Sequence, residues 1–417
     1  MSKNNIINLR CFDQEIGKIG YDENLNKSYF QYNPAFLKSG IYSNLFPLIF
    51  KRVEQTQVFS QYNNYTFRNL PPMIADSLPD MFGNLIFKTW LESNGFEKIT
   101  ALEQLAYLAN RGMGALEYEP IAHIPRNTSI NLDEIITVLK KVMRQKSNTI
   151  SDGMDTGALI NIFKIGSSAG GAQPKILISE NKKSGKIIPG DVEYSNQYHH
   201  YLVKLHLDDE HRYNKCLIEY SYFLTAQCLD IEMMCSKLID NKHFATLRYD
   251  RQNGGKQHTL TASGLTGWDF RNPQISSYEN LFNLANYLKV PHHDIHELFK
   301  RMVFNVVFAN ADDHLKNHAF IYNEISNEWQ LAPAYDMTYS LNPILNYKKS
   351  SRALSINNKR VDINREDLLK IAKENTIKNP KSIIDKTVQA IAYWQQQAQI
   401  AGISDKIISN MKRDFWN

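Results

Sequence analysis

Residues 303–317 (VFNVVFANADDHLKN) begin as an apolar run and end in a dense polar cluster. A buried carboxylate is unfavourable unless it is paired or bound to a metal, so a core helix that ends in such a cluster is expected to present it to a ligand. In this cluster the Asp312 carboxylate can accept the proton of a hydroxyl group, and the Asn317 side-chain oxygen can hold Mg²⁺. These two functions together are the chemistry of phosphoryl transfer to a hydroxyl.

The spacing of the two residues supports this interpretation. Asp312 and Asn317 are five positions apart, which is the separation of the catalytic Asp and the metal-binding Asn in the H-R-D-L-x-x-x-N loop of protein kinases. A kinase also needs a second acidic metal ligand further along the chain, and Asp336, in QLAPAYDMTYS, meets this need. The alternative is that residues 312–317 only cap a helix C-terminus and that Asp336 lies in an unrelated turn.

The composition is that of an ordinary globular protein. The chain has 417 residues, of which 43% are hydrophobic and 22% charged, enough for two or three domains with cores of their own. Its formal net charge of +5 is too small over this length to imply nucleic-acid binding by itself. The four cysteines form no C-x-x-C pair, so neither a zinc site nor a redox motif is indicated, and reduced thiols in a cytosolic protein are expected.

We expect a cytoplasmic protein with no membrane partner. The first ten residues, MSKNNIINLR, contain no apolar segment of the kind found in signal peptides. No apolar run approaches the ~20 residues needed to cross a bilayer.

The first third of the chain predicts a compact α/β unit. Residues 6–32 have the pattern of short strands joined by turns, and residues 80–93 have apolar side chains at a helical period. Thr100 and Glu103 predict a capping box at the start of a second helix. Residues 115–121 (ALEYEPI), which follow that helix, are strand-like.

Residues 166–175 (GSSAGGAQPK) lie between two strand-like segments. Small residues let backbone N–H groups approach and surround phosphate oxygens, so this stretch is a candidate phosphate-binding loop. It is neither a G-x-x-x-x-G-K-[ST] loop nor the G-x-G-x-x-G loop of ordinary protein kinases. The alternative is a plain glycine hairpin.

A lysine and a glutamate further along the chain are candidates for the rest of a nucleotide site. Residues 201–206 (YLVKLH) predict a strand with Lys204 inside it, an unusual place for a lysine that has no partner. Residues 217–229 predict a helix with Glu219 near its start, and kinases pair such a glutamate with the strand lysine that contacts the nucleotide phosphates. The alternative is a surface lysine and a glutamate favoured by the helix dipole.

The last third of the chain is mainly helical. Residues 244–251 (FATLRYDR), which precede it, predict a strand that ends in charge, and in a kinase this strand would be the hinge beside the adenine pocket. Beyond it, apolar side chains recur at a helical period in five segments, which are residues 278–288, 293–309, 365–373, 383–398 and 404–415.

The order of these parts resembles that of the HipA family of serine/threonine kinase toxins: glycine loop, strand lysine, helix glutamate, R-Y-D-R, D-x-H-x-K-N and A-Y-D. The resemblance covers most of the chain. FRNLPPMIADSLPDMFGNLI and GMGALEYEP are similar to the small subdomain that precedes the kinase core in this family, and SINNKRVDINREDLLKIA is similar to its C-terminal helical lobe. Several motifs in the same order are far more specific than any one of them.

The resemblance implies roles for individual residues. Asp312 matches the catalytic aspartate, Asn317 and Asp336 match the Mg²⁺ ligands, and Glu219 matches the ion-pair partner of the strand lysine. The residues implied to bind ATP come from the phosphate loop, the strand lysine, the hinge, the catalytic loop and the A-Y-D motif, and they are Gly170, Gly171, Ala172, Gln173, Pro174, Lys175, Lys204, Leu247, Arg248, Tyr249, His314, Lys316, Asn317, Tyr335 and Asp336.

The resemblance also implies a means of inactivation. Members of the family are inactivated by autophosphorylation of a serine in the glycine-rich loop. Ser168 stands at this place, and Ser167 is the adjacent alternative. A phosphate group adds about −1.5 to −2 charges, so at this place it would repel the ATP phosphates and displace the loop.

Partners follow from the same resemblance. The implied cofactors are ATP and Mg²⁺. The implied protein partner is a small helix-turn-helix antitoxin, which binds operator DNA and links the toxin to that DNA indirectly. The implied substrate is an aminoacyl-tRNA synthetase, with the glutamate enzyme as the leading example.

The fold class that we expect is α+β, with the two lobes of a HipA-like protein kinase. The expected domains are an N-terminal subdomain at residues 1–125, a kinase N-lobe of mainly antiparallel sheet at residues 126–260, and an all-helical C-lobe at residues 261–417. The expected function is that of an ATP- and Mg²⁺-dependent serine/threonine protein kinase. Two alternatives remain: a non-catalytic HipA-like scaffold that binds the antitoxin, and a small-molecule kinase on the same fold, since a nucleotide site does not specify the acceptor.

Overall fold

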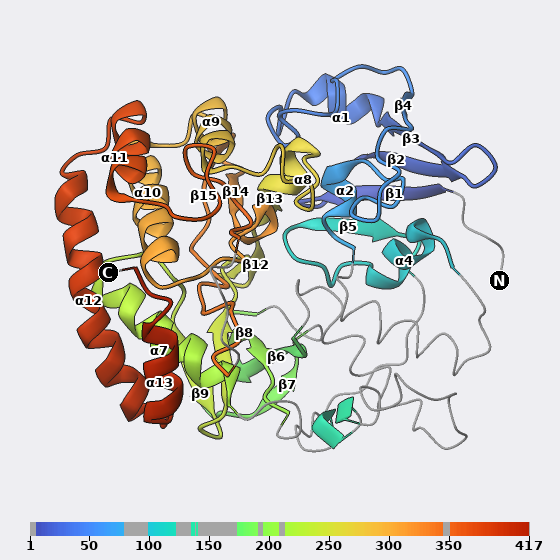
Figure 1. Ribbon diagram of the computed structural model, residues 1–417. Helices are drawn as coiled ribbons and strands as arrows, with labels where there is room; N and C mark the ends of the chain where they lie inside the picture. Colours follow the sequence, from blue (N-terminus) through green and yellow to red (C-terminus); the bar gives the residue numbers. More distant parts are fainter. Residues whose placement is uncertain are drawn as a thin grey trace. The chain divides into compact units, whose positions relative to one another are not determined.

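The computed structural model describes residues 6–78, 99–121, 135–137, 139–140, 173–190, 195–207, 213–344 and 351–416 (Figure 1). The chain divides into two compact units. The first unit contains Met1–Leu207, Ala245–Leu260 and Gly264–Gly267, and the second contains Asp208–Phe244, Thr261–Ser263 and Trp268–Asn417. The predicted helix at residues 80–93 lies outside the described residues, and so do residues 166–172 of the glycine loop.

An antiparallel sheet opens the first unit. Its strands are β1 (Ile6–Cys11), β2 (Gln14–Asp22), β3 (Lys27–Tyr32), β4 (Gln57–Phe59) and β5 (Leu116–Glu119), in the order β4-β3-β2-β1-β5. Alternate residues of β1 are buried, which is the period of a strand with one face on the core: Ile7, Leu9 and Cys11 are inaccessible to solvent. The strands predicted over residues 6–32 are therefore confirmed.

The described part of the first unit also contains the helices α1 (Pro34–Ser39), α2 (Pro72–Ala75) and α4 (Ala101–Leu108). The start of α4 is fixed by two reciprocal hydrogen bonds. The Glu103 N–H donates to the Thr100 hydroxyl oxygen at 3.1 Å, and the Thr100 N–H donates to the Glu103 carboxylate at 2.7 Å. These bonds satisfy two backbone donors that the first turn leaves unpaired, and the predicted capping box is confirmed.

A second sheet carries the predicted lysine strand. Strands β6 (Lys175–Asn181), β7 (Ile187–Pro189) and β8 (Tyr198–Lys204) pair antiparallel, with β6 in the middle. Next to β8 lies β10 (His243–Leu247), within which the chain passes from the second unit into the first. The predicted strands at residues 201–206 and 244–251 correspond to β8 and β10, each shifted by a few residues.

A buried ion network follows β10. The Asp250 carboxylate lies 2.8 Å from the guanidinium groups of both Arg248 and Arg251, and all three side chains are at most 1% exposed. The Gly114 N–H also donates to Asp250 at 2.8 Å, and Arg251 donates to the Gly112 carbonyl oxygen at 2.8 Å. Burial alone would raise the pKa of Asp250, but the two guanidinium groups hold it below its usual value. The network therefore ties the end of β10 to the turn before β5.

His258, at the start of β13 (His258–Thr261), is expected to make the first unit sensitive to acid. It is fully buried, and burial lowers the pKa of its imidazole from 6.5 to about 3. Below pH 6.5 the unfolded chain therefore binds a proton that the folded chain accepts only near pH 3, so stability falls as the pH falls through this window. The loss is about 1.4 kcal/mol per pH unit. Above the window both states are neutral, and the effect vanishes.

Urea unfolding of the wild type at several pH values across the upper part of this window measures the effect. The variant His258→Gln is expected to reduce the slope of unfolding free energy against pH by about 1.4 kcal/mol per pH unit. The control is His292→Gln, which makes the same substitution at an exposed histidine of the second unit. Equal slopes in the wild type and in His258→Gln would show that this imidazole is not the group that titrates.

The second unit is mainly helical. Its helices are α7 (Lys215–Cys228), α9 (Tyr278–Tyr287), α10 (His292–Val307), α11 (Arg365–Glu374), α12 (Pro380–Ile400) and α13 (Asp405–Lys412). The long helix α12 packs against α7, α10, α11 and α13 (Figure 1). An aromatic cluster of Tyr222, Phe308, Trp394 and Phe415 fills the core between them. The helices predicted in this part of the chain are therefore confirmed.

The prediction of an all-helical C-terminal lobe needs one correction. An antiparallel hairpin of β14 (Ala319–Asn323) and β15 (Glu328–Leu331) lies between α10 and α11 in sequence. Phe320 pairs with Leu331, and Tyr322 pairs with Trp329. Strands of this length are too short for their period to stand out against the helices around them.

None of the helices in the described part of the chain has the length and apolar character needed to cross a membrane.

Candidate functional site

The site begins where α10 ends. The Tyr222 hydroxyl donates to the Phe308 carbonyl oxygen at 2.6 Å, so the aromatic core fixes the end of the helix. Ala309 has a φ of 53°, a left-handed conformation that residues other than glycine seldom adopt. The chain therefore turns sharply here, and the Asn310 N–H returns to the Asn305 carbonyl oxygen at 3.0 Å.

Residues 311–317 form a tight loop, which we call the catalytic loop because its Asp–Asn spacing is that of the kinase loop of this name. The His314 N–H donates to the Asp312 carbonyl oxygen at 2.9 Å, and the Asn317 N–H donates to the His314 carbonyl oxygen at 2.8 Å. The Asn317 side-chain nitrogen donates to the same Asp312 carbonyl oxygen at 2.9 Å. Because the amide nitrogen is used in this way, the Asn317 side-chain oxygen is the atom that can accept a cation.

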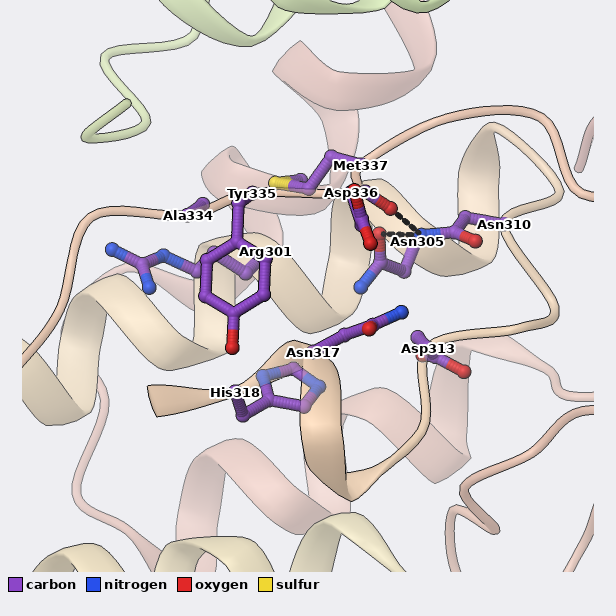
Figure 2. Close-up of a pocket in the computed structure, with 10 residues that line it drawn as sticks. All are labelled: Arg301, Asn305, Asn310, Asp313, Asn317, His318, Ala334, Tyr335, Asp336 and Met337. Carbon is purple, nitrogen blue, oxygen red and sulfur yellow. Dashed lines mark hydrogen bonds between the residues drawn. The ribbon is translucent and has the colours of Figure 1, made fainter. Parts of the chain in front are cut away.

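The segment after β15 brings Asp336 to the catalytic loop. The Tyr335 hydroxyl donates to the Lys316 carbonyl oxygen at 2.7 Å, and the Asn310 side-chain nitrogen donates to the Asp336 carbonyl oxygen at 3.3 Å. Figure 2 shows the side chains of Asn317 and Asp336 directed toward the same space. The structure therefore places the two predicted metal ligands on one small pocket, whose lining is Arg301, Asn305, Asn310, Asp313, Asn317, His318, Ala334, Tyr335, Asp336 and Met337.

A buried ion pair on α10 holds the segment that leads to Asp336. Arg301 donates to the Glu297 carboxylate at 3.0 Å and to the Ala332 carbonyl oxygen at 2.7 Å. Glu297 also accepts the Glu232 N–H at 2.8 Å. Breaking such a pair by removing one partner leaves an uncompensated buried charge, so Arg301 and Glu297 fix the approach to the site rather than supply its chemistry.

The electrostatic environment of Asp312 suits a proton acceptor near a cation. Desolvation raises the pKa of Asp312, the nearby His314 lowers it, and the Asp336 carboxylate raises it again. Two carboxylates that repel each other in this way are stabilised by a cation between them. Burial lowers the pKa of His314, while the carboxylates of Asp312 and Asp336 oppose this shift. The His314 ring packs against Phe270 with ring centroids 4.7 Å apart.

The two adjacent aspartates of the loop have opposite environments. Asp312 keeps an exposed surface although neighbouring atoms partly desolvate its carboxylate, whereas Asp313 is 1% exposed. Asp313 accepts a hydrogen bond from the Tyr278 hydroxyl at 2.6 Å and forms an ion pair with Arg352 at 2.5 Å. Of the two carboxylates, Asp312 is therefore the one that a substrate hydroxyl can reach.

Four residues that are predicted to bind the nucleotide lie in the described part of the chain before the hinge. They are Gln173, Pro174, Lys175 and Lys204, and they lie at the ends of β6 and β8 in the first unit. Gln173 and Pro174 lead into β6, and the Leu205 N–H donates to the Pro174 carbonyl oxygen at 2.8 Å. Lys175 stands opposite Lys204 in the antiparallel register, so both side chains lie on one face of the sheet. The two lysines are 2% and 6% exposed. Two ammonium groups on one buried face suit an anion such as a phosphate group.

The predicted hinge residues use most of their side-chain groups within the first unit. The Arg248 side chain is bound to Asp250, as described above. The Arg248 backbone N–H donates to the His200 carbonyl oxygen at 2.8 Å. The Tyr249 hydroxyl lies 3.5 Å from the Thr259 hydroxyl. An adenine base would therefore meet this segment through its remaining backbone groups or through the half-buried Leu247 side chain.

The roles of all the predicted site residues stay predictions, and for two groups of them the structure adds no evidence on how they meet the rest of the site. Glu219 is buried in α7 of the second unit, at 4% exposed, and its predicted pairing with Lys204 would join residues of different units. The glycine-loop residues Gly170, Gly171 and Ala172 lie outside the described residues, together with Ser167 and Ser168.

The donor set of the second unit fits Mg²⁺ shared with a nucleotide. Within the described residues, no group of three or more His, Cys, Asp or Glu side chains could hold a metal ion by itself. Magnesium is usually bound in proteins by one or two carboxylates together with substrate phosphates and water. Asp336 and the Asn317 side-chain oxygen provide the oxygen ligands that such a shared site needs.

Two family models match the chain. The HipA-like C-terminal domain matches residues 167–397, and the HipA N-terminal domain matches residues 7–119. The first of these alone covers more than half of the chain. No curated protein sequence matches the chain significantly.

Solved structures agree with the family models. A chain of the Shewanella oneidensis MR-1 toxin–antitoxin complex of HipA, HipB and operator DNA is similar, with a TM-score of 0.67 and 16% identity over 98% of this chain and 97% of that chain. At this identity the likeness shows a common fold, and the expected α+β, HipA-like fold is confirmed. The Helicobacter pylori proinflammatory kinase CtkA matches 53% of this chain and 86% of its own at 14% identity, with a TM-score of 0.38 that is too low to carry an argument.

Proposed function

Because the chain belongs to the HipA family, we propose that it is an ATP- and Mg²⁺-dependent serine/threonine protein kinase and the toxin of a toxin–antitoxin module. One observation carries the proposal: Asn317 and Asp336 face one pocket, and the exposed Asp312 of the loop that carries Asn317 interacts electrostatically with Asp336. This arrangement supplies an oxygen site for Mg²⁺ and an adjacent carboxylate for the acceptor hydroxyl, which are the two requirements of phosphoryl transfer.

In the proposed reaction each side chain of the site has its own role. Asp312 orients the acceptor hydroxyl and takes its proton, while Asn317 and Asp336 hold Mg²⁺. When bound, Mg²⁺ neutralises charge on the transferred phosphoryl group. The cationic side chains of Lys175 and Lys204 attract the nucleotide phosphates. The remaining catalytic-loop and A-Y-D residues that the family resemblance assigns to ATP are His314, Lys316 and Tyr335.

The partners are proposed from the family. The similar Shewanella protein was solved with HipB and operator DNA, which supports a small helix-turn-helix antitoxin as the partner of this chain, with operator DNA reached through it. The proposed substrate is a protein of translation, an aminoacyl-tRNA synthetase. The proposed inactivation is autophosphorylation of Ser168 in the glycine loop.

Intact mass after incubation with ATP and Mg²⁺ tests the proposal. We expect the wild type to gain one phosphate, Ser168→Ala to lose this gain, and Ser167→Ala, the matched control, to keep it. A gain lost in Ser167→Ala instead would move the modified site by one residue. No gain in any protein, together with no ATP binding in calorimetry, would contradict the proposed kinase activity.

A further inference from the structure

Arg352 joins three parts of the site through one buried side chain. Its guanidinium donates to the Asn305 carbonyl oxygen and to the Asn310 carbonyl oxygen, both at 3.1 Å. It also forms the ion pair with Asp313 at 2.5 Å, and Arg352 as a whole is 8% exposed. One side chain therefore holds the last turn of α10, the sharp turn that follows it and the catalytic loop.

The segment that carries Arg352 is itself fixed to the catalytic loop. Residues 351–356 follow Asp336 in sequence. The Ala353 N–H donates to the Ala311 carbonyl oxygen at 2.7 Å, and the Tyr278 N–H donates to the Ser355 carbonyl oxygen at 3.0 Å. The backbone of this segment thus contacts the start of the loop directly, and the Arg352 guanidinium adds a charged contact within it.

The Asp313 carboxylate, which pairs with Arg352, is buried and accepts a second hydrogen bond. The Tyr278 hydroxyl donates to the carboxylate oxygen that also contacts Arg352, and the Asn305 side-chain nitrogen donates to the Tyr278 hydroxyl oxygen at 3.1 Å. Burial raises the pKa of Asp313, while the Arg352 guanidinium and the Tyr278 hydroxyl lower it. The carboxylate is turned into the unit and anchors the loop, in contrast to its neighbour Asp312.

This contact differs from a known kinase device in that it needs no added phosphate. In protein kinases, phosphorylation of the activation loop orders that loop through new pairs between arginine and the added phosphate. In this chain the acidic group, Asp313, belongs to the catalytic loop, and the arginine belongs to the segment after the metal-binding aspartate. The pair forms between two unmodified side chains, so it needs no phosphorylation.

We propose that Arg352 is a positioning residue, which holds the catalytic loop in its active arrangement through Asp313 without phosphorylation of the segment that carries it. This proposal rests on the proposed kinase activity. Its consequence is that activity depends on an ion pair whose two side chains are both buried.

The test needs a variant that removes the ion pair between Arg352 and Asp313 without leaving a buried charge. Arg352→Gln alone strands the Asp313 carboxylate, and such variants can fail to fold. Arg352→Gln combined with Asp313→Asn replaces the ion pair with two neutral amides and leaves Tyr278 in place. The matched control is Arg365→Gln, which removes the guanidinium of an exposed pair with Asp385 that spans 2.7 Å.

Two measurements on the full chain test the proposal. Hydrogen exchange without nucleotide is expected to be about tenfold faster in the double variant, but only at the amides of the last turn of α10, the turn after it and the catalytic loop, residues 305–317. In phosphoryl transfer, measured below the unfolding midpoint, kcat is expected to fall about 10- to 100-fold. The KM for ATP should stay within about twofold, because the lost interaction positions the reacting groups and does not bind the nucleotide.

A folded double variant with wild-type exchange in the loop and the kcat of the Arg365→Gln control would overturn the proposal. Faster exchange throughout the second unit with unchanged kcat would also overturn it, because it would show a merely structural role. The exchange measurement needs no catalysis. A wild type that transfers no phosphate would therefore overturn the proposed kinase activity. The hydrogen-exchange rate of the loop in the double variant would still show whether Arg352 positions the loop.

Discussion

Replacing Asp312 by asparagine is expected to reduce phosphoryl transfer by about 10²- to 10⁴-fold, the range that a positioned general base contributes. Asp312 is the exposed carboxylate of the catalytic loop, and Asn317 binds its backbone oxygen rather than its side chain. The substitution therefore removes the proton acceptor and leaves the loop hydrogen bonds in place. Nucleotide binding and the fold should persist, which calorimetry and thermal unfolding measure on the same samples.

The unfolding midpoint gives this experiment an internal check. Desolvation and, to a smaller extent, repulsion from Asp336 raise the pKa of Asp312, so removing its charge should leave the midpoint unchanged or slightly raise it. The control is Asp385→Asn, which neutralises an exposed carboxylate paired with Arg365 on the surface. If Asp312→Asn keeps wild-type turnover with a normal unfolding transition, Asp312 is not the base.

Replacing Asp336 by asparagine is expected to lower phosphoryl transfer by at least about 10²-fold and to abolish the effect of Mg²⁺ on ATP affinity, because magnesium sites rely on one or two carboxylates. Asparagine is the appropriate replacement. Asp336 has a φ of 52°, and asparagine is among the few residue types that readily adopt this conformation. The backbone should therefore keep its course while the charge is lost.

Titration of ATP with and without Mg²⁺ measures the second part of this prediction. The matched control is Asp362→Asn, since Asp362 has a φ of 54° and is exposed. We expect Mg²⁺ to strengthen ATP binding in the wild type and the control, and to have no effect in Asp336→Asn. An unchanged Mg²⁺ effect in Asp336→Asn would remove Asp336 from the metal site.

The parts of the site that depend on local sequence could be predicted. Asp312, His314 and Asn317 lie within one tight turn, so their mutual geometry follows from a short stretch of chain. The capping box at Thr100 and the helices of the second unit have strong local signals for the same reason. The comparison with kinases also indicates Asp336, downstream of the loop, as a second acidic ligand, although the hairpin of β14 and β15 that carries the chain toward it is not predicted.

The residues that position the site could not be predicted, because their partners are distant in sequence. Arg352 meets Asp313 across 39 positions, and Tyr278 meets it across 35. An arginine and a tyrosine in polar segments have no local pattern that separates a buried partner from a surface residue. The one available signal was Asn305 within the apolar run VFNVVF, since a buried amide requires hydrogen-bond partners from elsewhere in the fold.

The central claim, that the pocket of Asn317 and Asp336 beside Asp312 is a phosphoryl-transfer centre, is tested most directly by a single-turnover assay. The assay follows ADP formation from ATP by the wild type and by Asp312→Asn, each with Mg²⁺ and with a chelator. We predict that the wild type forms ADP only with Mg²⁺, matched by phosphate on its own chain, and that Asp312→Asn forms almost none. ADP formation at equal rates in both proteins, or none in the wild type when ATP is bound, would contradict the account.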